Sequence, residues 1–252
     1  HKKYDASSIE VLEGLEPVRR RPGMYIGGTD NASMHHLFSE VIDNAMDEAV
    51  ANFASFIEVK VETDNTISIY DNGRGIPIDP HPNFPDKSAL EVIMTTLHAG
   101  GKFSNKVYQT SGGLHGVGIS VVNALSEFVD VDVYRDKKIY NQKFSKGHPT
   151  SKLKEIKKKT NKKGTKISFK PDPEIFGPDN NFNCNKLYDF SKSKAYLFAG
   201  VEIRWFCDSE ISKKENIPEN DIFKFSQGLI DLVQNEVDEK MSLLSEIFSG
   251  NR

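Results

Sequence analysis

The chain has 252 residues, of which 27% are charged and 37% are hydrophobic, and its formal net charge is −3. This composition is typical of a soluble globular protein and excludes a chain that is basic as a whole, as a general nucleic-acid binder would be. No apolar run approaches the roughly 18 residues that a membrane span needs, and Cys184 and Cys207 are the two cysteines, few enough to favour a reducing compartment. We therefore expect a cytoplasmic protein with no membrane partner and with both thiols buried.

The first 30 residues are predicted to form an irregular arm that holds a short helix over residues 7–15. The segment 16–28 is bounded by prolines and glycines, and we predict a fixed turn or loop there. It contains three adjacent arginines, Arg19 to Arg21. For a bare run of charge, a solvated or structural role is favoured over contact with nucleic acid.

Residues 34–50 give the clearest helical pattern. On a helical wheel, His36, Glu40, Asn44, Asp47 and Glu48 fall in one narrow stripe, and apolar residues fill most of the remaining circumference. The helix has no Lys or Arg to pair with these carboxylates, whereas a solvated helix face usually mixes both signs of charge. We therefore favour a stripe that faces a functional site over one that faces water.

The next pattern is a predicted hairpin of strands 56–62 and 66–70, in which apolar residues alternate. The second strand runs into Asp71-Asn-Gly-Arg-Gly-Ile-Pro. An acid with glycines at a strand end is where α/β folds place ligands, and a simple Asx-type turn explains the same residues equally well. A proline-rich loop over 81–85 and a helix over 88–98, with Ser88 as its N-cap, follow.

The stretch 98–126 carries two glycine clusters, Gly100-Gly101 and Gly112-Gly113-Leu-His-Gly116-Val-Gly118, with Lys102 between them. A buried helix is predicted immediately afterwards. A glycine-rich turn that leads into a helix N-terminus is an anion site, most often for phosphate; a flexible loop is the alternative. The spacing matches neither the Walker loop nor the dinucleotide-binding fingerprint, so a nucleotide here would need another architecture.

The lysine-dense segment 146–163 is predicted as a solvated hairpin loop, with DNA contact as the minority alternative. Trp205 is expected to pack in the core. The remaining predicted strands cover residues 128–134, 138–144, 164–171 and 201–206, and the remaining helices cover 187–198 and 227–248.

Four features thus follow one another: the acidic stripe, the acid at a strand end, the lysine after paired glycines, and the phosphate-type loop. Their order resembles the ATP-binding region shared by DNA gyrase B, the Hsp90 chaperones, MutL and sensor histidine kinases. Five longer blocks extend the pattern: Glu16-Pro-Val-Arg-Arg-Arg-Pro-Gly-Met-Tyr-Ile, Glu40-Val-Ile-Asp-Asn-Ala-Met-Asp-Glu-Ala, Asp71-Asn-Gly-Arg-Gly-Ile-Pro, His98-Ala-Gly-Gly-Lys-Phe-Ser and Ser111-Gly-Gly-Leu-His-Gly-Val-Gly-Ile-Ser-Val-Val-Asn-Ala-Leu-Ser.

These blocks resemble the ATPase subunit of bacterial type IIA DNA topoisomerases, and the likeness runs from Tyr4 to about Phe248. Lys102-Phe-Ser-Asn and Gly118-Ile-Ser are more similar to the B subunit of topoisomerase IV than to gyrase B. The resemblance implies an α+β fold, a two-layer α/β sandwich of the GHKL (Bergerat) type. Its mixed, mostly antiparallel sheet would carry helices on one face, with ATP between helix and sheet under a lid of residues 98–118.

The same resemblance implies a domain layout. Residues 1–222 would form the ATP-binding domain, with a dimerisation arm over about 1–27, and residues 223–252 would begin a truncated transducer domain. The family's lysine for the γ-phosphate lies in that second domain, beyond this chain. We therefore expect a nucleotide-binding fragment of a larger enzyme.

The resemblance also assigns roles to residues. Glu40 matches the general base that activates water, His36 would orient it, and Asn44 matches the Mg²⁺ ligand. Asp71 would accept a hydrogen bond from the adenine amino group, with Thr165 supporting it through water. The other implied ATP contacts are Tyr4, Glu48, Arg74, Gly75, Ile76, Pro77, Lys102, Tyr108, Gly113, Leu114, His115, Gly116, Val117 and Gly118, with Arg135 at the pocket mouth.

The implied function is ATP binding and hydrolysis that drives DNA strand passage. The implied partners are ATP, Mg²⁺, a second copy of the chain in an ATP-dependent dimer, the A subunit of the topoisomerase, DNA, and competitive inhibitors of the adenine pocket. The gyrase homologue is the main alternative. A sensor histidine kinase domain and a nucleotide-regulated DNA-binding module, which would use Arg19–Arg21 and the 146–163 loop, are more remote ones.

Overall fold

The computed structural model describes residues 12–99 and 118–238 of the chain. Within these ranges the strands are β1 (Phe56–Val61), β2 (Ile67–Asp71), β3 (Pro80–His81), β4 (Phe84–Ser88), β5 (Ser126–Arg135), β6 (Lys138–Ser145), β7 (His148–Pro149), β8 (Lys154–Ile156), β9 (Gly164–Pro171), β10 (Glu202–Cys207) and β11 (Asn220–Phe223). The helices are α1 (Glu16–Arg20), α2 (Gly23–Ile26), α3 (Asn31–Val50), α4 (Ala89–Thr95), α5 (Ile119–Ala124), α6 (Pro173–Phe176), α7 (Cys184–Leu197), α8 (Ser209–Glu215) and α9 (Leu229–Asp238).

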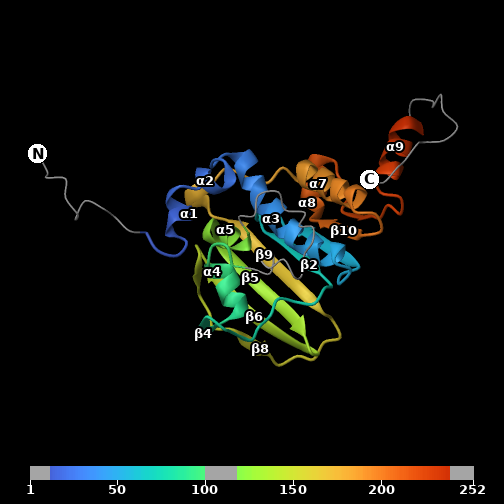
Figure 1. Cartoon of the computed structure of the whole chain (residues 1–252). Coiled ribbons are helices and arrows are strands. Elements are labelled where there is room, and N and C mark those ends of the chain that lie inside the picture. The colour runs from blue at the N-terminus through green and yellow to red at the C-terminus, as the bar shows by residue number, and fades with distance from the viewer. Residues whose placement is uncertain (1–11, 100–117, 239–252) are drawn as a thin grey trace, which may run out of the picture.

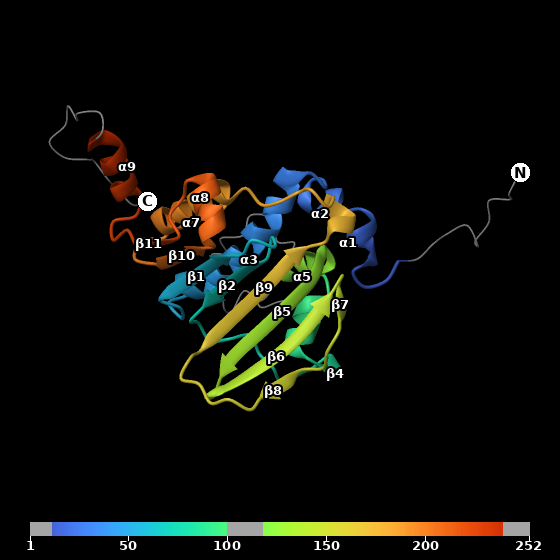
Figure 2. The same cartoon turned by 180° about the vertical axis from the view of Figure 1, so that it is seen from behind.

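The centre of the described structure is a nine-stranded sheet in the order β11-β10-β1-β2-β9-β5-β6-β7, with β8 paired to β6. The β1–β10 pair is parallel and the other pairs are antiparallel. The helices lie on one face of this sheet, and its other face is open in the view from behind (Figures 1 and 2). The predicted α+β architecture, a mixed sheet with helices on one face, is therefore confirmed.

The core lies between the sheet and the buried faces of α3 and α5. Leu37, Val41 and Ile42 of α3 and Val121 and Val122 of α5 are fully buried. Helix α3 begins three residues earlier than predicted, because the Asp30 side chain accepts a hydrogen bond from the Ser33 N–H at 2.8 Å and so caps the helix. This long helix crosses the sheet beside β1, β2 and β9.

Several segments differ from the sequence predictions, and the predicted loop over 146–163 contains the short strands β7 and β8. The predicted loop over 16–28 forms the short helices α1 and α2, with a proline in the first turn of α1, where its missing N–H does no harm. The described end of the predicted 7–15 helix is not helical. The predicted loop over 81–85 is part of the small β3–β4 hairpin. For residues 16–28 and 81–85 proline marked the segment as irregular, although proline also fits helix starts and short edge strands.

The predicted C-terminal helices and strand are present, whereas α6, α8 and β11 were not predicted. Helix α7 starts at Cys184, because the Asn183 side chain caps it by accepting the Lys186 N–H. Trp205 is completely buried, and both cysteines are buried and free. The predicted 227–248 helix is present as α9, and its remainder lies outside the described residues. No described helix has the length and apolar character to cross a membrane.

Candidate functional site

Asp71 ends β2 and is 3% exposed. Its Oδ1 accepts a hydrogen bond from the Gly73 N–H at 2.8 Å, so the Asx-type turn considered from the sequence is present. Burial raises the pKa of the Asp71 carboxyl to about 7; the bond from Gly73 opposes this, and the nearby charge of Glu48 adds to it. A buried carboxyl of raised pKa is a candidate functional group as well as a turn residue.

Two glycines make room for Asp71, one beside its side chain and one beside its backbone. A Cβ on Gly73 would lie 2.7 Å from Asp71 Oδ1 and 2.7 Å from Glu48 Oε2. A Cβ on Gly164 would lie 1.9 Å from the Asp71 backbone oxygen, and Gly164 also has φ +110°. Neither glycine was among the predicted site residues. The glycine pattern after Asp71 pointed to Gly73, whereas the contact of Gly164 depends on strand pairing that the local sequence does not reveal.

The segment after Gly73 is held against β9 and β5. Thr165 is buried directly opposite Asp71 in the β2–β9 register, and its Oγ1 accepts the Ile76 N–H at 3.1 Å. Arg135 Nη1 donates to the Gly75 carbonyl at 3.1 Å. Gly75 has φ +78°, a conformation that glycine adopts without strain. Ile76 is half-buried here, whereas Pro77 is exposed.

Helix α3 carries the predicted polar stripe along one side. His36 is exposed, and Glu40, Asn44 and Glu48 are half-buried at successive turns after it. Asp47 is 2% exposed, so it is the buried member of this stripe.

The positive partners of the α3 carboxylates come from other elements. Lys194 of α7 pairs with Asp43 at 2.6 Å, and Arg74 pairs with Glu48. Lysine and arginine side chains of other elements therefore pair with these carboxylates, and α3 needs no lysine or arginine of its own. The missing lysines and arginines do not by themselves mark a site.

The α3 stripe reaches the start of α5. The Gly118 N–H donates to Glu40 Oε2 at 3.1 Å, and Gly118 is the N-cap of α5 with φ +78°. The end of the predicted glycine loop is thus joined to the predicted general base. The other predicted residues of this loop and of the arm lie outside the described residues: Tyr4, Lys102, Tyr108, Gly113, Leu114, His115, Gly116 and Val117.

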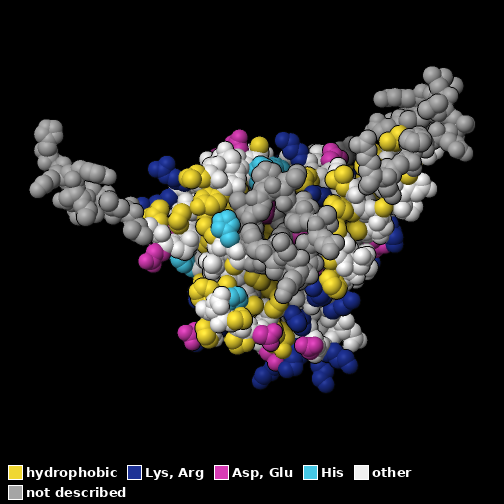
Figure 3. All heavy atoms as spheres, viewed as in Figure 1, with side chains coloured by type: hydrophobic (Ala, Val, Ile, Leu, Met, Phe, Trp, Pro, Cys, Tyr) yellow, Lys and Arg dark blue, Asp and Glu magenta, His cyan; other side chains and the backbone are white. Residues whose placement is uncertain are grey.

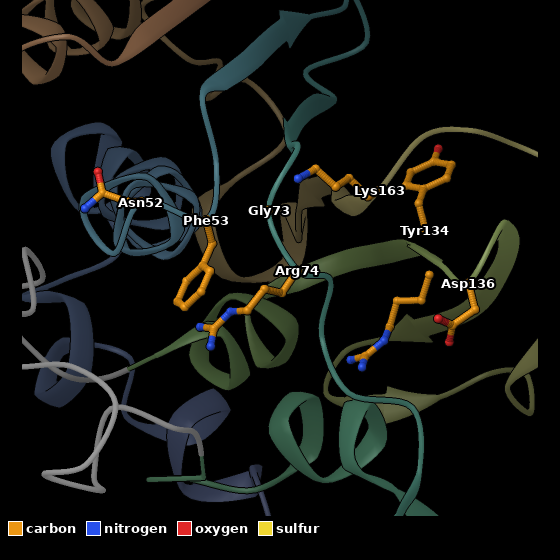
Figure 4. A pocket seen from close by; sticks show the side chains of 8 residues that line it. Asn52, Phe53, Gly73, Arg74, Tyr134, Asp136 and Lys163 are labelled. Atoms are coloured by element: carbon orange, nitrogen blue, oxygen red, sulfur yellow. The ribbon is translucent and has the colours of Figure 1, made fainter.

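An open pocket of about 470 Å³ adjoins these groups. The Glu48 carboxylate accepts three hydrogen bonds from Arg74: from its backbone N–H at 3.0 Å, from Nε at 3.1 Å and from Nη2 at 2.6 Å. The Arg74 guanidinium lies over the Phe53 ring, 3.7 Å from its centroid, and Figure 4 shows the two side chains together. Such stacking fixes a cation in place. The lining includes the predicted Arg74 and Arg135, and also residues not predicted from the sequence: Asn52, Phe53, Gly73, Tyr134, Asp136 and Lys163.

Comparison with known proteins identifies the family. The profile of the histidine kinase-, DNA gyrase B- and HSP90-like ATPases matches residues 29–175. The chain belongs to this ATPase family. Most of the groups described above, from the α3 stripe to β9, fall inside the matched residues. The family expected from the sequence blocks is therefore confirmed.

Individual relatives of this ATPase refine the resemblance. The chain is 57% identical over 248 residues to the B subunit of DNA topoisomerase 4 from Bartonella bacilliformis, covering 98% of the chain and 36% of the relative. It is 48% identical over 232 residues to the B subunit of DNA gyrase from Thermotoga maritima, covering 92% of the chain and 35% of the relative. The predicted closer likeness to topoisomerase IV is confirmed.

A solved structure supports the fold of this ATPase. The 43K ATPase domain of Thermus thermophilus gyrase B, solved with an aminocoumarin, superposes with a TM-score of 0.78 at 38% identity, over 92% of this chain and 57% of that one. The GHKL fold is therefore confirmed. The chain spans little more than a third of the Bartonella relative, so the activity of a whole enzyme does not follow from the likeness alone.

Proposed function

We propose that this chain binds ATP between α3 and the sheet, and that its hydrolysis drives DNA strand passage in a type IIA topoisomerase, as the ATPase part of the B subunit of a topoisomerase IV. The observation that carries this proposal is the buried Asp71 carboxyl, set beside the α3 stripe in a chain of the ATPase family. The corresponding part of gyrase is the second candidate, supported by a lower identity of 48%.

Adenine recognition is proposed for Asp71. Its carboxylate accepts a hydrogen bond from the exocyclic amine, and Thr165, opposite it in the register, supports the base through water. Gly75 leaves space for the base to lie close, and Glu48, Arg74, Ile76 and Pro77 form the outer wall. Guanine would present a carbonyl oxygen to the same carboxylate, and a site built for one hydrogen-bonding edge rejects the other by roughly 10⁴-fold.

The chemical step is proposed for α3. Glu40 takes a proton from the water that attacks the γ-phosphate, and His36, one turn earlier, orients it. The N–H of Gly118 on Glu40 ties this base to the end of the glycine loop. The base is then positioned when that loop surrounds the phosphates.

Magnesium is proposed to bind at Asn44. The amide oxygen of Asn44 lies one turn from both Glu40 and Glu48, and oxygen donors of this kind suit Mg²⁺, which takes few protein ligands and completes its shell with phosphate and water. When bound, the ion neutralises charge on the phosphates during transfer. The chain's own part is to hold that oxygen donor beside the general base.

The remaining assignments follow the family pattern. Lys102 and Tyr108, with the backbone amides of Gly113, Leu114, His115, Gly116, Val117 and Gly118, are proposed to hold the phosphates. Residues 1–222 form the ATP-binding domain, and residues 223–252 begin the transducer domain. The arm over about 1–27 carries Tyr4 to the second copy of the chain in an ATP-dependent dimer.

The intact enzyme is proposed to work with the A subunit of the topoisomerase and with DNA. Its adenine pocket is proposed to accept competitive inhibitors, as the gyrase relative was solved with an aminocoumarin. Full-length protein tested with the A subunits of topoisomerase IV and of gyrase, on relaxed and interlinked DNA circles, separates the two assignments. Decatenation without supercoiling supports topoisomerase IV, and supercoiling supports gyrase.

Calorimetry tests the nucleotide assignment directly. We expect this chain to bind a non-hydrolysable ATP analogue and to give no measurable heat with the GTP analogue. Similar affinities for both would remove the assignment of Asp71. A phosphotransfer experiment with labelled ATP tests the remote kinase alternative: stable label on the protein would support a histidine kinase and contradict the hydrolytic function proposed here.

A further inference from the structure

Positive charge in this acidic chain is concentrated in one stretch. Residues 137–163 contain eleven lysines and a single acidic residue, Glu155, whereas the rest of the chain contains 22 basic and 35 acidic residues. All of this stretch is described by the structure. A chain with a net charge of −3 therefore has one strongly basic region and is acidic elsewhere.

The fold brings the two ends of this stretch together at one edge of the molecule. Strand β8 pairs with β6 through Ile156 opposite Ile139, and the Thr160 N–H donates to the Lys137 carbonyl at 3.2 Å. The loop between β8 and β9 thus lies against the β5–β6 turn. We call the exposed lysines of these two segments the lysine edge: Lys137, Lys138, Lys157, Lys158, Lys159, Lys162 and Lys163.

The space-filling view agrees with this topology. Lys and Arg side chains gather at the lower end of the molecule in Figure 3, where Figure 1 labels β6 and β8. Helices α7 and α8 lie at the other end. In this view the basic region is gathered at one end of the molecule.

Little of this charge is neutralised. Lys138 pairs with Glu155 at 2.9 Å, and Lys162 lies over the rings of Tyr70 and Tyr134, 5.2 and 5.9 Å from their centroids. Among the carboxylates of the described ranges, none lies within ion-pair distance of the other exposed lysines of the loop. The stacking of Lys162 anchors the loop, and its neighbours project into solvent.

We propose that the lysine edge binds the phosphate backbone of duplex DNA. This inference rests on the proposed function, which makes DNA the polyanion that the protein meets. Lysines hold phosphates as point charges and read no sequence, which suits an enzyme that must act on any segment of DNA. The acidic remainder of the chain repels the same polyanion and directs it to this edge.

Two triple variants test the proposal with the same change in charge. The first is Lys157→Gln/Lys158→Gln/Lys159→Gln on the lysine edge. The control is Lys186→Gln/Lys213→Gln/Lys214→Gln, three exposed lysines on α7 and α8. Binding of a fluorescently labelled DNA duplex is followed by anisotropy between about 50 and 200 mM salt, the range in which phosphate contacts are most visible.

The affinity falls as salt rises, so the slope of log K against log salt is negative. Each lost phosphate contact makes this slope shallower by about 0.9. We therefore expect the slope of the first variant to be shallower than that of the wild type by up to about 2.7. Its affinity at low salt should be at least roughly tenfold weaker. The control should keep the wild-type slope. No DNA binding by the wild type, an unchanged slope in the first variant, or an equal loss in the control would overturn the proposal.

Two further measurements separate this proposal from its rivals. Titration with the ATP analogue should give the same affinity in all three proteins; if none binds ATP while DNA binding still depends on the lysine edge, the proposed function fails and this inference stands. Vesicles of phosphatidylserine and phosphatidylcholine test a membrane surface. Lysine-dependent binding to vesicles without binding to the duplex would contradict a DNA surface.

Discussion

Lowering the pH should weaken ATP binding through Asp71. The pKa of this carboxyl is about 7, raised mainly by its burial. The ionised form is the stronger acceptor for the adenine amine, because a protonated carboxyl is uncharged and one of its two oxygens carries a donor proton. The contribution of Asp71 to affinity is therefore present above pH 7 and is lost as the pH falls below it.

The size of the effect follows from the titration. With a pKa of about 7, the ionised fraction of Asp71 falls about tenfold between pH 8 and pH 6, which corresponds to about 1.4 kcal/mol of binding free energy. The Kd of an ATP analogue should rise by up to the same factor. Adenosine should show the same trend, which excludes titration of the phosphates as the cause.

Asp71→Asn is the matched control, since the amide keeps the shape and an acceptor oxygen but does not titrate. Its affinity for adenosine should be lower at pH 8 and nearly constant with pH. Calorimetry at several pH values measures both proteins. A wild-type profile as flat as that of the variant, or a variant that keeps the wild-type slope, would refute the role of Asp71 as the titrating acceptor.

Other predictions concern the chemical step and the packing around Asp71. Glu40→Ala, in a protein extended through the second domain, should keep its affinity for ATP and lose roughly 10²–10⁴-fold in turnover; near wild-type hydrolysis would move the base elsewhere. Gly164→Ala should lower the Tm by roughly 5–10 °C, because its Cβ would meet the Asp71 backbone oxygen at 1.9 Å, whereas Gly200→Ala, with open space around it, should lower the Tm much less. Without nucleotide, Asp71→Asn should raise the Tm more at pH 8 than at pH 5. The reason is that a carboxyl whose pKa is raised in the folded state destabilises that state increasingly as the pH rises from about 4 to 7. Equal Tm shifts at both pH values would contradict this. Glu48→Gln should lower the midpoint of the Asp71 titration, since the Glu48 charge helps to raise it, and an unmoved carbon-13 NMR midpoint would argue against that coupling.

Periodic patterns predicted the elements that form the frame of the site. The apolar spacing of α3 and the alternation in β1 and β2 each depend on a few neighbouring residues, so the local sequence contains the information. The short helices α1 and α2 and the β3–β4 hairpin were missed because proline and glycine are compatible with both loops and short elements.

Contacts between distant strands could not be predicted in the same way. The close approach of Gly164 to Asp71 depends on the β2–β9 register, which joins residues far apart in the chain. The burial of Asp47 was missed because a helical wheel gives the direction of each side chain but not which other parts of the fold cover it. The clamp of Arg74 between Glu48 and Phe53 likewise exists only once α3 and the end of β2 are packed together.

The contact of Gly164 has a consequence for how the sequence can vary. The lysines from Lys157 to Lys163 are exposed to solvent, while Gly164 has no room for a Cβ. In a library of all single substitutions selected for folded protein, tolerated changes should therefore be frequent from Lys157 to Lys163 and stop abruptly at Gly164. Folding alone therefore leaves the lysine edge free to vary, so lysines retained there across species would be retained for binding, one residue away from a position that packing fixes.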